Sequence, residues 1–191
     1  MLIGLTGTPG TGKTSVSNLL KEEYGYKIIH LNELIKEEHL YSEVDTKRDS
    51  VIADMEQVIA RVNDLTCRHG NNDERNDKIT ILESHLSHHI ADIVIVLRAS
   101  PDELRKRLSK RKYPLAKIQE NVEAEALDVI LVESFEWCDQ IFEINTTGRY
   151  ISDIAKDIAQ IVGVLSSSRH DKNDILVKFK PGSLDWSGEI D

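Results

Sequence analysis

The sequence predicts an α/β fold, with a five-stranded parallel sheet and helices on both of its faces. Three observations support this prediction: short apolar runs alternate with helical patterns, a glycine-rich loop follows the first run, and a length of 191 residues suits one globular domain. The composition is 40% hydrophobic with only 4 Pro, which is enough apolar material for one core. In such sheets, ligands bind beyond the carboxyl ends of the strands.

Each element is predicted from its apolar spacing: short continuous runs indicate buried strands, and intervals of three and four residues indicate helices. The expected strands are Leu2–Thr6, Lys27–Leu31, Ile79–Leu82, Ile93–Leu97 and Gln140–Ile144. The expected helices are Thr14–Tyr24, Asn32–Glu38, Arg48–His69, Pro101–Lys110, Leu115–Trp137 and Ser152–Leu165. Because strands and helices alternate, the sheet should be parallel and buried on both faces. We expect one domain over residues 1–165.

The loop Gly7–Thr14 has the complete pattern of a phosphate-binding P-loop, Gly-Thr-Pro-Gly-Thr-Gly-Lys-Thr. It follows a predicted strand and opens a predicted helix, which is the context that this motif requires. Its glycines let the backbone approach a phosphate, and the loop N–H groups face that phosphate. Lys13 should neutralise the β- and γ-phosphates, and the Thr14 hydroxyl should hold Mg²⁺. The alternative is a glycine-rich turn that binds nothing.

The net charge of −9 argues against a general nucleic-acid coat, and we expect no sequence-specific nucleic-acid binding. No apolar run reaches membrane-spanning length, and the N-terminus reads as a strand rather than a signal peptide. Cys67 and Cys138 are far apart and have no ligand-like neighbours. They fit ordinary thiols in a reducing cytoplasm, with a disulfide between them as the alternative.

A second polar signal, Glu83-Ser84-His85, stands at the end of the third predicted strand. Glu83 is placed to hold water on Mg²⁺, and His85 could orient a water or contact phosphate. Together with His88 and His89, these residues offer the ligand types of a zinc site. The spacing matches no closed set of four ligands, and no cysteine is near, so we interpret His88 and His89 as a polar helix turn.

Residues 98–117 hold eight Lys and Arg residues against two acidic ones, although the whole chain is negative. A solvated helix face is one interpretation of this charge. The other is a polyphosphate site, because Tyr113-Pro114 breaks the helix and leaves a basic loop that can close over a nucleotide. Arg105 or Arg107 would then stabilise charge on the transferred phosphoryl group. Closure would also exclude water and favour transfer over hydrolysis.

The region from Asn32 to Ser50 is rich in acidic residues, and in a kinase it would hold the phosphate acceptor. Lys36 and Arg48 are its available phosphate partners, with ordinary surface charge as the alternative.

Residues 166–191 read as a polar linker and a tail. Val177 and Phe179 alternate with lysines, which predicts a strand. The tail either docks, on its own domain or on a partner, or is a flexible terminus.

These segments in this order resemble the nucleoside monophosphate kinases and, more closely, the adenylate kinase isoenzyme six family, over about residues 1–163. The segments that carry the resemblance are Leu5–Thr14, Glu37–Tyr41, Glu83–His85, Val96–Arg98 and Arg107–Tyr113. The acid and histidine after the third strand distinguish this family from ordinary adenylate kinases. The tail around Trp186 resembles that of archaeal members.

The resemblance implies a lid over about residues 110–120 and a monophosphate-binding region over about residues 29–52. The residues that it implies for ATP binding are Gly10, Gly12, Lys13, Thr14, Ser15 and Arg111. His85 would take the family histidine's role in catalysis and ATPase activity. The chain departs from the family pattern in two places: Glu83 stands where Asp is expected, and Lys36 stands where Arg would give bidentate phosphate contacts.

We therefore expect a broad-specificity nucleoside monophosphate kinase that converts ATP and AMP to two ADP with Mg²⁺. The expected catalytic residues are Lys13, Glu83, His85 and Arg111. The resemblance also implies ATPase activity and a role in small ribosomal subunit (rRNA) maturation.

Two alternatives remain. One is an ATP-driven ribosome assembly factor that binds a basic small-subunit ribosomal protein through the acidic stretch from Glu33 to Glu56. The other is a P-loop kinase of small metabolites.

Overall fold

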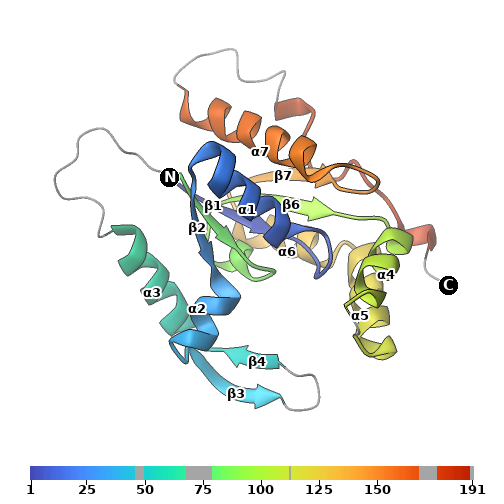
Figure 1. Cartoon of the computed structure of the whole chain (residues 1–191), viewed down its shortest axis with the longest axis horizontal. Helices are drawn as coiled ribbons and strands as arrows, with labels where there is room; N and C mark the ends of the chain where they lie inside the picture. The colour runs from blue at the N-terminus through green and yellow to red at the C-terminus, as the bar shows by residue number, and fades with distance from the viewer. Residues whose placement is uncertain (46–49, 68–78, 112, 168–175, 190–191) are drawn as a thin grey trace.

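A five-stranded parallel sheet forms the centre of the molecule, in the strand order β2-β5-β1-β6-β7 (Figure 1). The computed structural model describes residues 1–45, 50–67, 79–111, 113–167 and 176–189. The strands of this sheet are β1 Leu2–Thr6, β2 Lys27–His30, β5 Thr80–Glu83, β6 Ile93–Arg98 and β7 Gln140–Asn145. The predicted fold class is confirmed, and for the five strands of this sheet every predicted end lies within one residue of the observed one.

Alternation along the strands sorts their apolar side chains between the two faces of the sheet. Ile3 and Leu5 of β1 pack with Ile95 and Leu97 of β6 in the main core cluster. The helices that cover this face are α1, Lys13–Tyr24, and α7, Ile151–Ser166 (Figure 1). Side chains from both helices belong to the same cluster.

The opposite face is covered in two parts. Val94 and Val96 of β6 pack against Leu131 of α6, Val129–Trp137. Nearer β2, helices α2, Leu31–Glu37, and α3, Met55–Cys67, contribute a second apolar cluster.

A two-stranded hairpin replaces the start of a predicted helix. Strand β3, Tyr41–Asp45, pairs antiparallel with β4, Ser50–Ala53, so the prediction of a helix from Arg48 is wrong at its N-terminal end. Helix α3 begins only at Met55, because the Asp54 carboxylate accepts a hydrogen bond from the Gln57 N–H, at 3.2 Å.

The single long helix predicted for Leu115–Trp137 is also wrong, because two helices occupy this region. Helix α5, Leu115–Ala126, ends before α6 begins, and Asp128 between them has a φ of 57°. A non-glycine residue in this left-handed conformation interrupts the helical hydrogen bonds. The preceding helix α4, Pro101–Ser109, agrees with its prediction, and Ser100 caps its N-terminus.

The tail docks on its own domain. The predicted strand around Val177 and Phe179 is wrong: residues 176–180 form a tight turn, with the N–H of Phe179 bonded to the Leu176 carbonyl at 3.0 Å. Phe179 is only 3% exposed and belongs to the main core cluster, and its carbonyl accepts from the Glu143 N–H. Two short 3₁₀ helices complete the fold, η1 at Ser87–His89 and η2 at Ser187–Glu189.

Among the described helices, none combines the length and apolar character that a bilayer crossing demands.

Candidate functional site

The P-loop connects the carboxyl end of β1 to the N-terminus of α1. Its three glycines all have positive φ angles: 133° at Gly7, where a Cβ would lie 2.3 Å from the Leu97 carbonyl oxygen, and 101° at Gly10. Gly12 has a φ of 104° and is the N-cap of α1. The loop therefore has the conformation that turns N–H groups toward an anion at a helix N-terminus.

Lys13 lies inside this loop with its side chain buried. Its Nζ donates to the carbonyl oxygens of Gly7, at 2.5 Å, and Thr8, at 3.1 Å. Burial lowers the pKa of Lys13 to about 8, although Glu83 and Glu125 both act in the opposite direction. A phosphate near this ammonium would favour its charged form.

Thr14 and Glu83 meet because β1 and β5 are adjacent parallel strands whose carboxyl ends lie at the same edge of the sheet. The Thr14 hydroxyl donates to Oε1 of Glu83 at 3.2 Å. The other carboxylate oxygen lies 2.9 Å from Nδ1 of His30, at the end of β2. We call Lys13, Thr14, Glu83 and His30 the phosphate cluster.

His85 follows β5 and is half-buried beside this cluster. Burial, followed by the nearby charge of Lys13, lowers the pKa of His85 to about 4. At neutral pH its imidazole is therefore uncharged, with one nitrogen that can donate a hydrogen bond to water or phosphate and one that can accept a hydrogen bond from water. Its carbonyl accepts from the Thr6 hydroxyl at 3.4 Å, which ties the segment to the end of β1.

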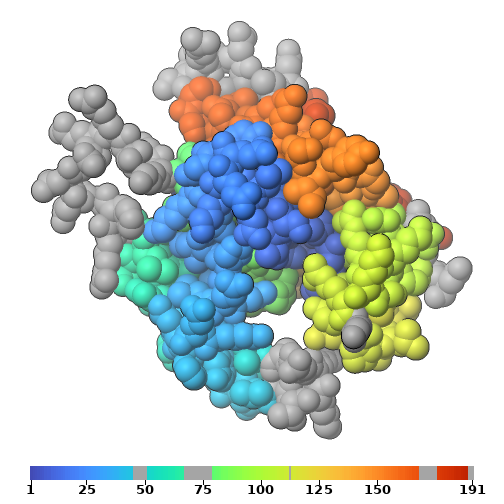
Figure 2. Space-filling model, viewed as in Figure 1, coloured from blue at the N-terminus to red at the C-terminus, as the bar shows by residue number. Residues whose placement is uncertain are grey.

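A cleft of about 240 Å³ opens beside the P-loop, where α1, α4 and the start of α7 meet (Figure 2). Its lining includes Gly10, Gly12 and Ser15 on one side and Arg111 on another, so the structure brings these four predicted residues together. Arg149, just before α7, also lines the cleft and was not predicted.

Arg107 also lines the cleft and supports the P-loop. Its guanidinium lies 3.4 Å from the carbonyl oxygens of Gly10 and Thr11 and bonds to the Thr146 carbonyl at 2.9 Å. Arg105, by contrast, pairs on the surface with Asp102. Arg107 and Arg111 of the basic segment both line the cleft, but Arg107 is half-buried and bonded to the protein, whereas Arg111 is exposed.

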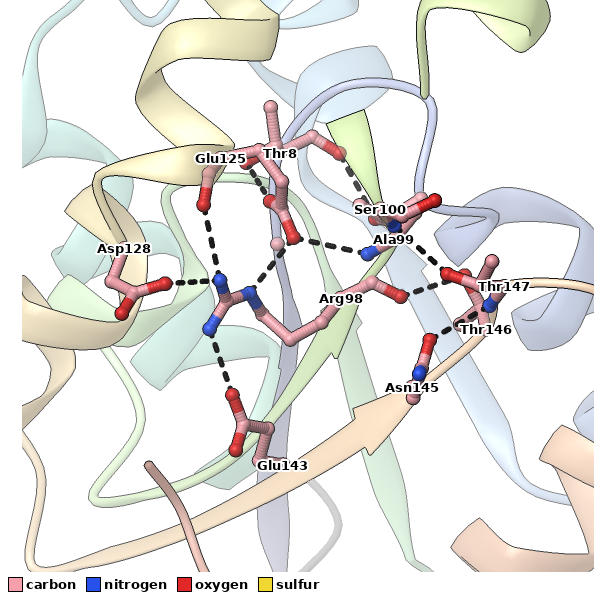
Figure 3. Close-up of polar contacts among 12 residues, drawn as sticks. Thr8, Arg98, Ala99, Ser100, Glu125, Asp128, Glu143, Asn145, Thr146 and Thr147 are labelled. Carbon is pink, nitrogen blue, oxygen red and sulfur yellow. Dashed lines mark hydrogen bonds and ion pairs between the residues drawn. The ribbon is translucent and has the colours of Figure 1, made fainter. Parts of the chain in front are cut away.

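Arg98 is enclosed in the protein. It is 2% exposed and pairs with Glu125 at 2.8 Å, Glu143 at 2.7 Å and Asp128 (Figure 3). We call these four residues the arginine cluster. Burial alone would lower the pKa of Arg98, but the carboxylates outweigh burial and raise it. Part of the positive charge in the basic segment is therefore structural.

The arginine cluster touches both the P-loop and the tail. The Thr8 hydroxyl donates to Glu125 (Figure 3), and the hydroxyl and N–H of Ser183 donate to Glu143 at 3.1 and 2.9 Å. The ring of Trp186 lies against Arg98, with its centroid 5.0 Å from the guanidinium carbon.

The two residues predicted to contact the acceptor phosphate are not brought into the phosphate cluster or the cleft by the described part of the structure. Lys36 is exposed near the end of α2, and Arg48 lies outside the described residues. The space-filling view shows the surface hollowed between α2 and helices α4 and α5 (Figure 2).

His30, Glu125 and Arg149 have no local motif that would have predicted their roles. His30 had one signal, since it ends a strand that neighbours β5.

The sheet, the P-loop and the cleft together define a protein with a P-loop kinase fold. Residues 3–128 match the AAA domain family. The chain belongs to a family of archaeal proteins that carry the name "putative adenylate kinase". It is 60% identical to the member from Methanosarcina acetivorans over 190 residues, covering 100% of both chains. It is 35% identical to the member from Methanocaldococcus jannaschii, covering 98% of this chain and 93% of the other.

Solved structures extend the likeness of fold to more distant proteins. A shikimate kinase from Acinetobacter baumannii, in complex with shikimate, superposes with a TM-score of 0.60 at 16% identity. The match covers 86% of the present chain and 94% of the shikimate kinase chain. The YorR protein of Bacillus subtilis, in complex with phosphorylated GDP, gives a TM-score of 0.58 at 19% identity. This match covers 89% of the present chain and 100% of the YorR chain. At these identities the comparison concerns the fold alone.

Proposed function

We propose that this protein is a broad-specificity nucleoside monophosphate kinase that transfers the γ-phosphoryl group of ATP to AMP and forms two ADP. The observation that supports this proposal most is that the phosphate cluster and the cleft lie beside the same P-loop. The buried Lys13, the Thr14–Glu83 pair and the exposed Arg111 therefore surround one loop. The name of the archaeal relatives agrees with this activity.

ATP would bind with its phosphates in the P-loop and the rest of the nucleotide in the cleft. Lys13 would leave the carbonyl oxygens of Gly7 and Thr8 to contact the β- and γ-phosphates. Gly10, Gly12 and Ser15 would line the donor site, and Arg111 would close it from the lid, over about residues 110–120.

Thr14 and Glu83 fit a magnesium site. Their oxygens lie 3.2 Å apart, and hydroxyl and carboxylate oxygens are the ligand types that Mg²⁺ prefers. Thr14 would bind the ion directly and Glu83 through water. Mg²⁺ would neutralise charge on the phosphates. The imidazole of His30 contacts the second oxygen of the Glu83 carboxylate and so holds this carboxylate in place.

The acceptor needs no strong base, because an incoming phosphate is already a nucleophile. We place it within residues 29–52, with Lys36 and Arg48 as phosphate partners. Neutral His85 would orient the acceptor or, when the acceptor is missing, a water molecule. That second case gives ATPase activity as a side reaction.

The test is a panel of acceptors offered to the purified protein with ATP and Mg²⁺: AMP, GMP, CMP, UMP and shikimate. ADP formation should exceed the hydrolysis rate most strongly with AMP, and Lys13→Met should abolish the excess. No excess with any monophosphate would contradict the proposal, and fastest transfer to shikimate would favour a small-metabolite kinase.

A second candidate function is assistance in small ribosomal subunit maturation, through a basic ribosomal protein. Glu33, Glu37 and Glu43 are exposed on α2 and β3, whereas Glu38 is already paired with Arg61 at 2.6 Å. Small-subunit proteins should be retained by the wild type and lost from a Glu33→Lys/Glu37→Lys variant. Negligible retention by both would contradict this role. Both activities fit the cytoplasm, where the free Cys138 thiol would stay reduced.

A further inference from the structure

A cluster of two histidines and a glutamate lies behind the P-loop, between η1 and α6. Its members are His88, His89 and Glu133, and the nearest nitrogen and oxygen atoms of the three side chains all lie within 4.8 Å of one another. Nε2 of His88 and Oε2 of Glu133 are 3.1 Å apart, and the two imidazole rings are 4.0 Å apart between centroids. Among the described residues, this is the one group of three such side chains with metal-ligand proximity.

We propose that His88, His89 and Glu133 bind a transition-metal ion of the zinc class, at a site separate from the magnesium site of the phosphate cluster. Imidazole nitrogens with a carboxylate oxygen suit Zn²⁺, and three protein ligands leave a fourth position for water. Zinc–ligand bonds of about 2.0–2.1 Å in a tetrahedron place ligand atoms roughly 3.3–3.5 Å apart. The His88–Glu133 pair already has nearly this separation, so only His89 must approach, by a side-chain rotation.

The surroundings of His88 favour ligation. Its ring is 1% exposed, and Nδ1 lies 3.3 Å from the Thr6 hydroxyl, which leaves Nε2 for the metal. With the metal bound, the Nδ1 proton would be donated to Thr6, and the Thr6 hydroxyl would donate to the His85 carbonyl. A second partner of this kind fixes the orientation of a ligating histidine.

The site would strengthen a junction of two elements that is already linked by the His88–Glu133 contact and by a hydrogen bond from the Cys138 thiol to the His88 carbonyl, at 3.3 Å. His88 and His89 belong to η1, directly after the segment of His85, and Glu133 belongs to α6. A bound ion would therefore brace the segment that follows β5 against α6. Sequence spacing alone did not predict it, because Glu133 stands 45 residues after His88.

The test is titration of the whole protein with Zn²⁺ in the calorimeter. We expect one equivalent to bind with a Kd in the micromolar range or below, and His89→Ala and Glu133→Gln each to weaken binding by at least about 10-fold. These positions are partly exposed, so both variants should fold. Two matched controls, His30→Ala and Glu136→Gln, should keep wild-type affinity, because His30 pairs with Glu83 elsewhere and Glu136 lies on the outer side of α6.

Titration with Co²⁺ provides a second readout. The bound ion should give visible absorption typical of four-coordinate cobalt and should quench Trp137, whose ring lies edge-on to His89 at 5.4 Å. Loss of binding in His30→Ala would place the metal in the phosphate cluster and overturn the proposal. So would the absence of a one-equivalent site, or unchanged affinity in both His89→Ala and Glu133→Gln.

Discussion

The phosphate cluster and the arginine cluster lie on two sides of the same P-loop, and both are rich in charge, but they are built in opposite ways. In the arginine cluster Arg98 and Glu125 are 2% exposed, and Arg98 pairs with all three carboxylates. In the phosphate cluster Thr14 is exposed, and Lys13 bonds only to loop carbonyls that a phosphate can replace. Charges that are fully paired inside the protein hold the loop, and charges with exchangeable partners are available to a ligand.

The largest expected effect comes from breaking the arginine cluster. Arg98→Met leaves Glu125 and Glu143 buried without their cation, which typically costs about 3–5 kcal/mol of unfolding free energy. In a chain of this length the Tm should fall by roughly 10 °C, measured by calorimetry. Arg105→Met is the control, because its pair with Asp102 is on the surface. Equal Tm values for the two variants would contradict the comparison.

Breaking the phosphate cluster should affect rate rather than stability. Lys13→Met removes the charge expected to act on the transferred phosphoryl group, so ADP formation should fall by about 10²–10³-fold. The Tm should not fall, because the substitution also removes the cost of burying the Lys13 ammonium away from water. Lys21→Met, on the exposed part of α1, should leave both quantities unchanged.

Thr8 connects the two clusters, so its substitution should affect both. Thr8→Val removes a hydrogen bond to the buried Glu125 carboxylate and should cost about 1.5–3 kcal/mol of unfolding free energy. Because this side-chain bond holds the loop whose Thr8 carbonyl contacts Lys13, the KM for ATP should rise. Thr8→Ser keeps the hydroxyl and should restore both stability and KM; a Ser variant as impaired as Val would show that the methyl group matters instead.

The tail contact should contribute less. Ser183→Ala removes one of two hydrogen bonds to Glu143 and should cost about 1 kcal/mol, which corresponds to a Tm decrease of roughly 2–4 °C. The rate of ADP formation should not change. Ser187→Ala is a suitable control, since its hydroxyl bonds to exposed Asp185 at the surface.

The smallest expected effect is a pH dependence that arises from Lys13. Its pKa is lowered from 10.5 to about 8 in the folded protein, so between these values the unfolded chain binds more protons than the folded one. Stability of the nucleotide-free protein should therefore rise with pH up to the end of this window, and the part of the rise between pH 7 and 8.5 should be about 1 kcal/mol or less. Urea unfolding of wild type and Lys13→Met should show this rise only in the wild type.

The sheet could be predicted from sequence because its strands are short apolar runs that follow one another in the order of an α/β fold. The hairpin could not, since β3 and β4 carry exposed residues such as Glu43 and Ile52 and lack a continuous apolar face. The break at Asp128 was also missed. Nothing in its neighbours marks the left-handed backbone, which brings its carboxylate to Arg98.

The residues of the candidate site also differ in how far the sequence indicates them. Lys13 and Thr14 belong to a contiguous motif, and Glu83 follows from the rule that adjacent parallel strands end at one edge, where its carboxylate accepts from the Thr14 hydroxyl. Glu125 could not be predicted, because its partners Thr8 and Arg98 are distant in sequence and the local pattern is that of an ordinary helix.

The arginine cluster also has a consequence for synthesis of the chain. Ser183 and Trp186 are made long after Thr8 and Arg98, yet they complete the surroundings of the buried charges. A nascent chain that has emerged only as far as α7 therefore holds Glu143 without its tail partners. The P-loop should reach its final rigidity only when the last part of the tail has left the ribosomal exit tunnel.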